Sequence, residues 1–316
     1  MKYHLPKRTL GRTGLDVTVI SFGGAAIGSN PKLLLYGMSV SDAVAIDTVN
    51  AALDRGINYI DTSPLYGESE RRIGIALKGT DRKSFILSTK AGTRPFLKGY
   101  SSRDFRKSVE MSLKTLGTEY IDILYIHDPE EEDFKKAMGK AGAFEEMLKM
   151  RDEGLIRFFG LGVRSHQLHR KFIESGNADV ILTWLDYNLL RQSAKDLLHL
   201  CKERNVGAVI GSPLCMGYLS GKDPRLIPRE HHHDISKEVD MKKLADMYSW
   251  CKERGIDLQQ INNRFILDNP GATTVLIGAA SPKEVRENIE TITNPLDINM
   301  YREFLDKFGL VPFSEK

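Results

Sequence analysis

Short apolar runs alternate along the chain with longer segments in which apolar residues recur every three or four positions. Short runs that end at Gly or at a polar residue are typical of buried strands, and the longer periodic segments indicate helices. The pattern predicts eight strands, at residues 17–22, 57–61, 85–89, 121–126, 156–161, 180–183, 206–210 and 274–277. It predicts helices at residues 42–55, 68–77, 102–116, 144–153, 166–175, 196–203, 236–254, 258–268, 281–289 and 298–308. Because strands that alternate with helices are joined by right-handed crossovers, we expect a parallel sheet.

Eight parallel strands are the number that closes a barrel, so the sequence predicts a (β/α)8 TIM barrel that forms a single domain over residues 1–316. A Thr-Gly pair within residues 10–17 favours a β-turn, and therefore an N-terminal β-hairpin that covers one end of the fold. A doubly wound open sheet is the alternative architecture. No Gly-x-Gly-x-x-Gly motif follows a predicted strand, which argues against that alternative.

The composition argues against several classes of protein. The 316 residues are 41% hydrophobic, enough for a sizeable core, and 45 basic against 42 acidic residues give a net charge of only +3. Because basic and acidic residues are nearly equal in number, the charge gives no reason to expect a nucleic-acid partner. The sequence has no run of 18 apolar residues, so no membrane association is expected. Three Cys residues without paired spacing favour reduced thiols, and we expect a cytoplasmic protein.

Ionisable residues follow three successive predicted strands at the point where each strand ends. Asp61 closes the second strand and Tyr66 follows five residues later, Lys90 closes the third strand, and His127 closes the fourth. In a parallel β/α barrel the carboxyl ends of the strands meet at one edge, where such proteins carry out their chemistry. The four side chains are therefore expected to converge on one site.

Together these residue types suit the donation of a proton to a carbonyl oxygen. Tyr has a pKa of about 10 in water, and a neighbouring ammonium such as Lys90 lowers that pKa by favouring the phenolate. Asp61 would keep the ammonium charged through an ion pair, and His127 would hydrogen-bond the substrate oxygen. Taken singly, Asp61 and Lys90 are as consistent with a structural ion pair, and Tyr66 with an ordinary loop residue. Their expected convergence at one edge favours catalysis.

The segment Asp61-Thr62-Ser63-Pro64-Leu65-Tyr66-Gly67, with Lys90 and His127 after it, resembles the active-site signature of the aldo-keto reductases. The resemblance extends over nearly the whole chain and includes residues 10–14, 212–214, 217, 220–222, 278 and 288. It implies a β/α barrel that uses NAD or NADP to move a hydride between nicotinamide and a carbonyl or alcohol. It also implies that Tyr66 is the acid or base, that Lys90 and Asp61 tune it, and that His127 orients the carbonyl.

By the same resemblance, the cofactor lies extended across the mouth of the barrel. Small residues after the first strand would lie near the nicotinamide, and a loop rich in backbone donors, with one ammonium, suits a pyrophosphate. The residues that the resemblance assigns to the cofactor are Gly23, Gly24, Ala25, Asp61, Arg164, Ser165, Ser212, Pro213, Leu214, Met216, Gly217, Lys222, Gly278, Ala280, Ser281, Glu284, Glu287 and Asn288. Trp184 and Gly211 depart from the common pattern, in which a Gln often holds the carboxamide and an aromatic residue often stacks on the nicotinamide.

Glu284 indicates which nicotinamide is preferred. In relatives that use NADP, the positions that match Ala280 and Glu284 often carry groups able to bond a 2′-phosphate. A carboxylate would repel that phosphate but accept hydrogen bonds from the free ribose hydroxyls of NAD. We therefore expect NAD to be preferred. Use of both cofactors is the alternative, because Ser281, Lys283 and Arg286 lie close by in the sequence.

The sequence leaves three functions open. The small residue before Ser212 and the sequence His127-Asp128-Pro129 are similar to the branch with sugar-oxidising members, which favours oxidation of an aldose at C1 to its lactone. A general NADPH-dependent reductase of aldehydes or ketones is the second function. A regulatory subunit that binds the cofactor and contacts a partner protein is the third. In both enzyme functions the substrate is a small-molecule carbonyl or sugar.

Residues 212–233 form the longest predicted loop, and a long polar loop after a strand at the catalytic edge is expected to be mobile and functional. Three consecutive His residues, at 231–233, lie in this loop. Three consecutive side chains point in different directions on most backbones, and the proton transfer described above needs no metal. No metal site is therefore expected.

Overall fold

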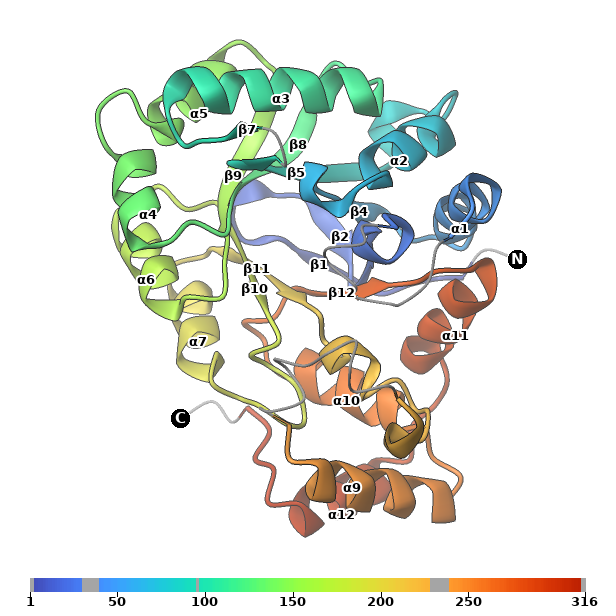
Figure 1. The fold of residues 1–316 in the computed structure, drawn as a ribbon. Coiled ribbons are helices and arrows are strands. Elements are labelled where there is room, and N and C mark those ends of the chain that lie inside the picture. The colour runs from blue at the N-terminus through green and yellow to red at the C-terminus, as the bar shows by residue number, and fades with distance from the viewer. Residues whose placement is uncertain (1–2, 30–39, 95–96, 228–238, 314–316) are drawn as a thin grey trace.

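Eight parallel strands close into a barrel at the centre of the molecule (Figure 1). The computed structural model describes residues 3–29, 40–94, 97–227 and 239–313. The barrel strands are β3 (Ile20–Gly23), β4 (Tyr59–Asp61), β5 (Ile86–Ala91), β8 (Ile121–His127), β9 (Ile156–Gly162), β10 (Val180–Trp184), β11 (Gly207–Gly211) and β12 (Thr274–Gly278). They follow one another around the barrel in chain order, and β12 pairs with β3 to close it. The predicted (β/α)8 TIM barrel is confirmed.

An antiparallel hairpin of β1 (Lys7–Thr9) and β2 (Asp16–Thr18) precedes the barrel, as predicted. Its turn packs against the amino-terminal end of the barrel, because a Cβ on Gly11 would lie only 2.2 Å from the backbone nitrogen of Gly207, where β11 begins. The prediction of one continuous strand over residues 17–22 is wrong. Its first residues pair with β1, whereas β3 pairs with β12 and β4, so the run is divided between two sheets.

Helices surround the barrel, and most of them occupy predicted positions (Figure 1). They are α1 (Asp42–Asp54), α2 (Ser69–Leu77), α3 (Ser102–Leu116), α4 (Glu131–Met138), α5 (Ala143–Asp152), α6 (His166–Glu174), α7 (Lys195–Glu203), α9 (Met241–Glu253), α10 (Leu258–Leu267), α11 (Pro282–Thr293) and α12 (Ile298–Lys307). The pattern did not predict α4 or the short antiparallel pair β6 (Thr93–Arg94) and β7 (Leu97–Lys98). The helix predicted over 236–254 begins at Met241, because the Asp240 side chain caps it there, and residues 236–238 lie outside the described part of the chain.

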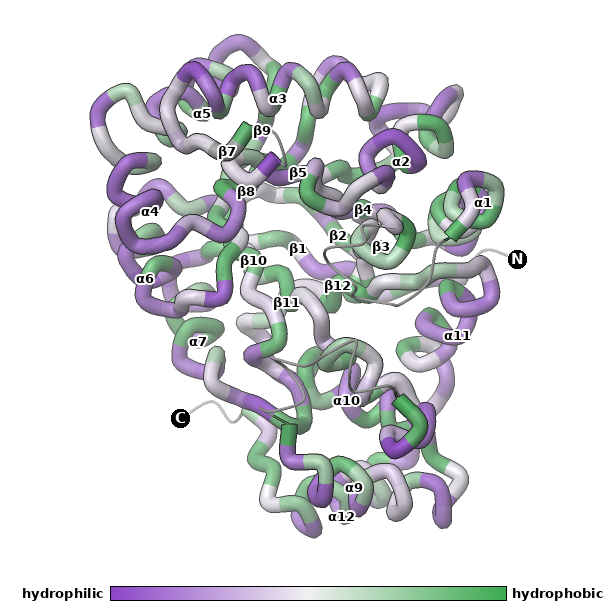
Figure 2. The backbone as a smooth tube through the Cα atoms, in the orientation of Figure 1, coloured by the Kyte–Doolittle hydropathy of each residue, from purple (hydrophilic) through white to green (hydrophobic). Residues whose placement is uncertain are grey.

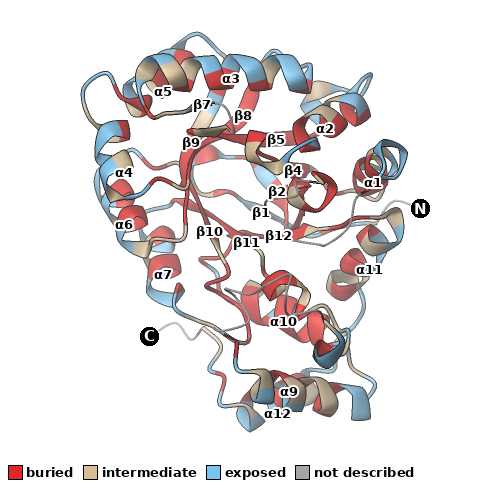
Figure 3. Cartoon of the chain, in the orientation of Figure 1, coloured by how far each residue is buried: buried red, intermediate tan, exposed pale blue. Residues whose placement is uncertain are grey.

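Two apolar layers hold the fold together. The barrel interior contains Tyr59, Ile123, Tyr125, Val180, Leu182 and Val209, and the hairpin adds Leu10, Leu15 and Val17 to the same cluster. A larger layer lies between the strands and the surrounding helices. Apolar and buried residues accordingly gather on the strands and on the inward faces of the helices, while the outer helix faces are polar and exposed (Figures 2 and 3). Because the hairpin fills one end of the barrel, a ligand has to enter from the other end.

Candidate active site

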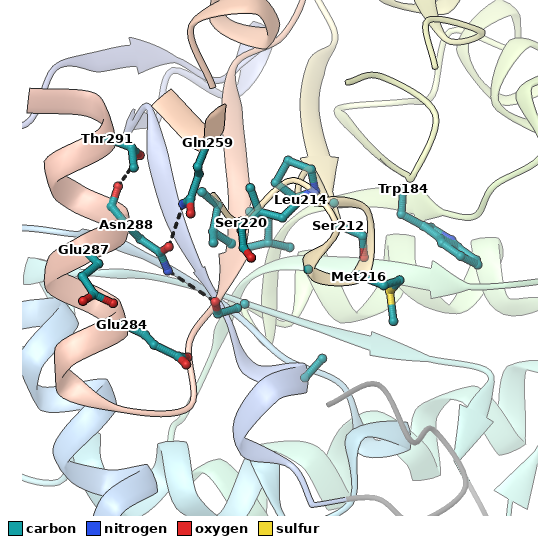
Figure 4. A pocket seen from close by; sticks show the side chains of 18 of the residues that line it. Trp184, Ser212, Leu214, Met216, Ser220, Gln259, Glu284, Glu287, Asn288 and Thr291 are labelled. Carbon is teal, nitrogen blue, oxygen red and sulfur yellow. Dashed lines mark hydrogen bonds between the residues drawn. The ribbon is translucent and has the colours of Figure 1, made fainter. Parts of the chain in front are cut away.

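A cavity of about 1090 Å³ opens at the carboxyl ends of the barrel strands. Residues from the strand ends, from the loop after β11 and from α11 line it (Figure 4). Non-glycine residues with positive φ directly follow three of these strands: Asp128 (38°) after β8, Leu185 (66°) after β10 and Ser212 (46°) after β11. Backbone strain of this kind clusters at functional sites. The cavity lies at the edge that the sequence predicts to be catalytic, and all four predicted side chains line it.

Lys90 and Asp61 form a buried ion pair between the adjacent strands β5 and β4. The Lys90 Nζ donates to Asp61 Oδ2 at 2.5 Å and to the carbonyl oxygen of Thr62 at 2.8 Å, while Ser88 Oγ donates to Asp61 Oδ1 at 2.6 Å. Both charged side chains are only 1% exposed. Burial opposes the charge on Lys90, but the attraction of Asp61 and Tyr66 outweighs it and raises the pKa of Lys90. The ammonium therefore keeps its proton at neutral pH.

Tyr66 ends a short 3-10 helix (Pro64–Tyr66) that follows β4. The loop packs closely against Gly28, where a Cβ would lie 1.8 Å from the carbonyl oxygen of Tyr66. The Lys90 Nζ lies 4.9 Å from the centre of the Tyr66 ring, and the His127 ring packs edge-on with a centroid distance of 6.0 Å. Burial raises the pKa of Tyr66, and Lys90 opposes the rise without cancelling it. The expected net lowering of this pKa is therefore wrong for this arrangement, and the phenol carries its proton at neutral pH.

His127 is buried, and hydroxyl groups contact one of its ring nitrogens. Its Nδ1 lies 2.6 Å from Thr93 Oγ1 and 3.2 Å from Ser63 Oγ. Ser63 Oγ already accepts from the backbone N–H of Leu65, so its own hydrogen is free to point at Nδ1. Burial, together with the Lys90 charge, lowers the pKa of His127 well below its usual range. The ring is therefore neutral, and donation by the hydroxyls to Nδ1 favours the tautomer with hydrogen on Nε2.

Sequence reasoning missed Thr93 and Ser63, because a single hydroxyl carries no pattern that connects it with a residue on another strand. Thr93 lies 34 positions before His127 and Ser63 lies 64 positions before it. Only Ser63 had a usable signal, since it belongs to the segment that carries Asp61 and Tyr66. The contacts of His127 therefore emerge only once the strands are placed side by side.

Most of the residues expected to hold the cofactor line the cavity. They are Gly23, Ala25, Asp61, Arg164, Ser212, Pro213, Leu214, Met216, Gly217, Lys222, Gly278, Ser281, Glu284, Glu287 and Asn288. Gly24, Ser165 and Ala280 do not line it. A Cβ on Gly24 would lie 2.5 Å from Ser69 Oγ, so this glycine serves the packing of α2. Ser165 caps α6, and Ala280 is buried beneath the start of α11.

The start of α11 presents polar groups to the cavity (Figure 4). Glu284 Oε2 accepts from the backbone N–H of Ala280 at 2.8 Å, and Asn288 Oδ1 accepts from Gln259 Nε2 at 2.7 Å. Asn288 Nδ2 donates to the carbonyl oxygen of Gly278 at 3.4 Å. The bond to the Ala280 N–H therefore holds the Glu284 carboxylate in place through Oε2, and this bond does not use Oε1. Gln259 was not among the predicted site residues, because it lies on a different helix, α10.

Close packing against β10 explains why β11 ends in a glycine. A Cβ on Gly211 would lie 3.1 Å from the Trp184 Cβ and 3.2 Å from a methyl carbon of Leu182, closer than ordinary packing allows. Trp184 lines the cavity (Figure 4), and its Nε1 donates to Asp128 Oδ1 at 3.4 Å. Neither this contact nor the place of Asp128 at the cavity was predicted. The two residues are 56 positions apart, so their contact has no local sequence signal.

Within the described ranges, no three His, Cys, Asp or Glu side chains come together in a way that could bind a metal ion. None of the helices in the same ranges has the length and apolar character needed to cross a membrane. The three cysteines, Cys201, Cys215 and Cys251, are buried. Residues 231–233, and the end of the predicted loop 212–233, lie outside the described residues. The start of that loop is packed, since Cys215, Met216, Tyr218 and Leu219 are buried.

A β/α barrel with a Tyr, a Lys–Asp pair and a His at its carboxyl edge defines a barrel oxidoreductase, and the comparisons specify the family. The model of the Aldo/keto reductase family matches residues 19–307, so the chain belongs to this family. An L-galactose dehydrogenase from Arabidopsis thaliana is 32% identical over 309 residues, which cover 95% of this chain and 92% of that protein. A D-threo-aldose 1-dehydrogenase from Pseudomonas sp is 28% identical over 326 residues, covering 95% and 96%. The holo form of an aldo-keto reductase from Bacillus halodurans has the same fold, with a TM-score of 0.76 at 23% identity over 96% of each chain.

Proposed function

We propose that this protein oxidises an aldose at C1 to its lactone, with NAD preferred over NADP. The observation that carries the proposal is the convergence of Tyr66, the buried Lys90–Asp61 pair and the neutral His127 on one cavity. The likeness to two sugar dehydrogenases over nearly the whole chain supports an aldose as the substrate. We also propose that residues 1–316 form one catalytic domain, because the family match spans residues 19–307.

In this proposal Tyr66 is the group that moves the proton. When the sugar is oxidised, Tyr66 acts as the base in its deprotonated form, which becomes more populated as the pH rises toward the raised pKa of Tyr66. The C1 hydroxyl loses its proton to this phenolate as the hydrogen on C1 leaves as a hydride. A bound nicotinamide supplies the hydride acceptor. His127 donates from Nε2 to the same substrate oxygen and so fixes its position. Lys90 favours the phenolate by its charge, and Asp61 holds Lys90 in place.

The cavity suits a dinucleotide cofactor. Its volume of about 1090 Å³ slightly exceeds the range of roughly 300–1,000 Å³ that ligand pockets usually span. Ser212, Cys215 and Met216 all have positive φ, and internal hydrogen bonds such as Cys215 N–H to the Ser212 carbonyl oxygen fold the loop into a tight turn that lines the cavity. These features and the nearby Lys222 support a pyrophosphate site in this loop. Glu287 and Asn288 would then lie near the adenine.

The preference for NAD is supported by the position of Glu284. Its Oε2 is bound to the N–H of Ala280, so the carboxylate is held at the start of α11, where it lines the cavity. A 2′-phosphate at this place would meet a fixed negative charge. The ribose hydroxyls of NAD could instead donate to the second oxygen of the carboxylate.

The test is a substrate panel measured by the absorbance of the reduced nicotinamide. Aldoses are offered with NAD and NADP, and simple aldehydes and ketones with NADH and NADPH. The proposal expects the highest kcat/KM for an aldose with NAD. A highest value for an aldehyde with NADPH would identify a general reductase instead. Cofactor binding without turnover of any compound would favour a regulatory subunit.

A further inference from the structure

A carboxylate that has no part in the proton transfer lies beside His127. Asp128 directly follows β8, lines the cavity, and has a side chain that is 38% exposed. Its φ of 38° lies in the left-handed region that non-glycine residues seldom adopt. The backbone therefore holds an ionisable side chain at the reacting end of the cavity at some cost in strain.

The two oxygens of this carboxylate have different surroundings. Oδ1 accepts from the indole Nε1 of Trp184 at 3.4 Å. Oδ2 lies 3.4 Å from Nε2 of His127, the atom that is proposed to hold the substrate oxygen. Oδ2 is therefore the carboxylate oxygen that lies beside the atom proposed to hold the substrate.

We propose that Asp128 determines specificity by accepting a hydrogen bond from a hydroxyl on the carbon next to the reacting carbon. This inference rests on the proposed function and narrows its substrates to 2-hydroxy carbonyl compounds, the class to which aldoses belong. Two oxygens on adjacent carbons can lie about 2.8 Å apart, which is close to a hydrogen-bond length. With the reacting oxygen on His127 Nε2, the neighbouring hydroxyl can therefore reach Asp128 Oδ2, which lies 3.4 Å from the same nitrogen.

Charge explains why the hydroxyl is needed. A carboxylate beside a carbonyl oxygen places two electron-rich atoms together, and a hydroxyl relieves this repulsion because it donates a hydrogen to the carboxylate. Burial raises the pKa of Asp128, while Trp184 and Lys90 oppose the rise by stabilising the carboxylate. A substrate without the hydroxyl displaces water from Oδ2 and returns no hydrogen bond. Sites built to hydrogen-bond a substrate hydroxyl discriminate strongly against analogues that lack it.

The experiment compares lactaldehyde with propanal, a pair that differs only in the 2-hydroxyl group. We expect wild-type kcat/KM to favour lactaldehyde by about 10- to 100-fold, the range for a hydrogen bond to a charged acceptor. Asp128→Ala should remove most of this preference, and Asp128→Asn, which keeps an acceptor without charge, should retain part of it. Glu290→Gln removes another carboxylate that lines the cavity and should leave the preference unchanged. A preference in Asp128→Ala equal to that of the wild type would overturn the inference.

A binding measurement separates this inference from the proposed function. The chain has two tryptophans, so in Trp250→Phe the indole fluorescence reports on Trp184 beside Asp128. Propane-1,2-diol and propan-1-ol are titrated into this variant with NAD bound, and then into the same variant with Asp128→Ala. The inference expects tighter binding of the diol, lost with Asp128→Ala, even if neither alcohol is turned over. Equal binding of the two alcohols would refute the role of Asp128, whatever the panel of substrates shows.

Discussion

Replacement of Lys90 by Met separates the structural role of the buried ion pair from its role in catalysis. Lys90 and Asp61 are each 1% exposed, so the substitution leaves the Asp61 carboxylate buried without its counter-charge. Breaking a buried ion pair by removing one partner typically destabilises a protein by about 3–5 kcal/mol. Ser88 still donates to Asp61 at 2.6 Å, so we expect a loss near 3 kcal/mol, about the lower end of that range.

The double variant Lys90→Met with Asp61→Asn removes both charges and serves as the matched control. We expect each single variant to be destabilised by about 3 kcal/mol, and the double variant by clearly less than the sum, because it leaves no unpaired charge. Urea unfolding at pH 7, followed by circular dichroism, measures these values. An additive loss in the double variant would show that the two side chains are not coupled.

Catalysis should respond differently from stability. Burial raises the pKa of Tyr66 and Lys90 opposes the rise, so without Lys90 the phenolate forms only at still higher pH. In Lys90→Met we therefore expect a lower rate of sugar oxidation and an ascending limb of the pH profile that moves to higher pH, so that the limb at lower pH is lost. The double variant should recover stability without recovering rate. A wild-type pH profile in Lys90→Met, or recovery of rate in the double variant, would refute the tuning role of Lys90.

Three further predictions concern single side chains. Thr93→Val removes a hydroxyl 2.6 Å from His127 Nδ1, so steady-state kinetics should show kcat/KM for the sugar lowered about 10-fold with the KM for NAD unchanged. His169 is buried, and burial lowers its pKa from 6.5 to about 4. Because the unfolded chain takes up this proton more readily than the folded one, the free energy of unfolding is about 3 kcal/mol higher above pH 6.5 than at pH 4, and this stability is lost as the pH falls through that range. Unfolding of His169→Gln across this range should show a flatter dependence, and an unchanged slope would exclude His169 as the cause. Glu284→Gln should shift the ratio of kcat/KM for NAD over NADP toward NADP, and a wild-type enzyme that prefers NADP would contradict the argument from this carboxylate.

The barrel could be predicted from the sequence because its strands are continuous apolar runs. Six of the eight strands close at a Gly or a polar residue, and the eight runs are separated by segments of helical periodicity. Helix α4 could not be predicted in the same way. It begins with Glu131, Glu132 and Asp133 and buries only Phe134 and Ala137 on its inner face, so its apolar positions are too few to reveal a period.

The convergence of the proposed catalytic residues was predictable for a related reason. Asp61 and His127 each end a strand and Lys90 lies one residue before the end of β5, and the parallel topology alone brings strand ends together. The pKa of Tyr66 was not predictable, because its sign depends on burial against Lys90, which requires the packed structure. Trp184 and Asp128 contact each other across 56 positions, and this contact depends on how the chain turns directly after β8, because Trp184 is still part of β10.

Single-turnover kinetics of Tyr66→Phe is the most direct test of the central claim, that Tyr66 moves the proton during hydride transfer. The substitution removes one hydroxyl and keeps the ring that packs against Lys90 and His127. Loss of a general acid or base typically lowers the rate by about 10²- to 10⁴-fold, and the account predicts a loss at least this large with the Kd for the nicotinamide nearly unchanged. A variant that keeps more than about a third of the wild-type rate would contradict the assignment.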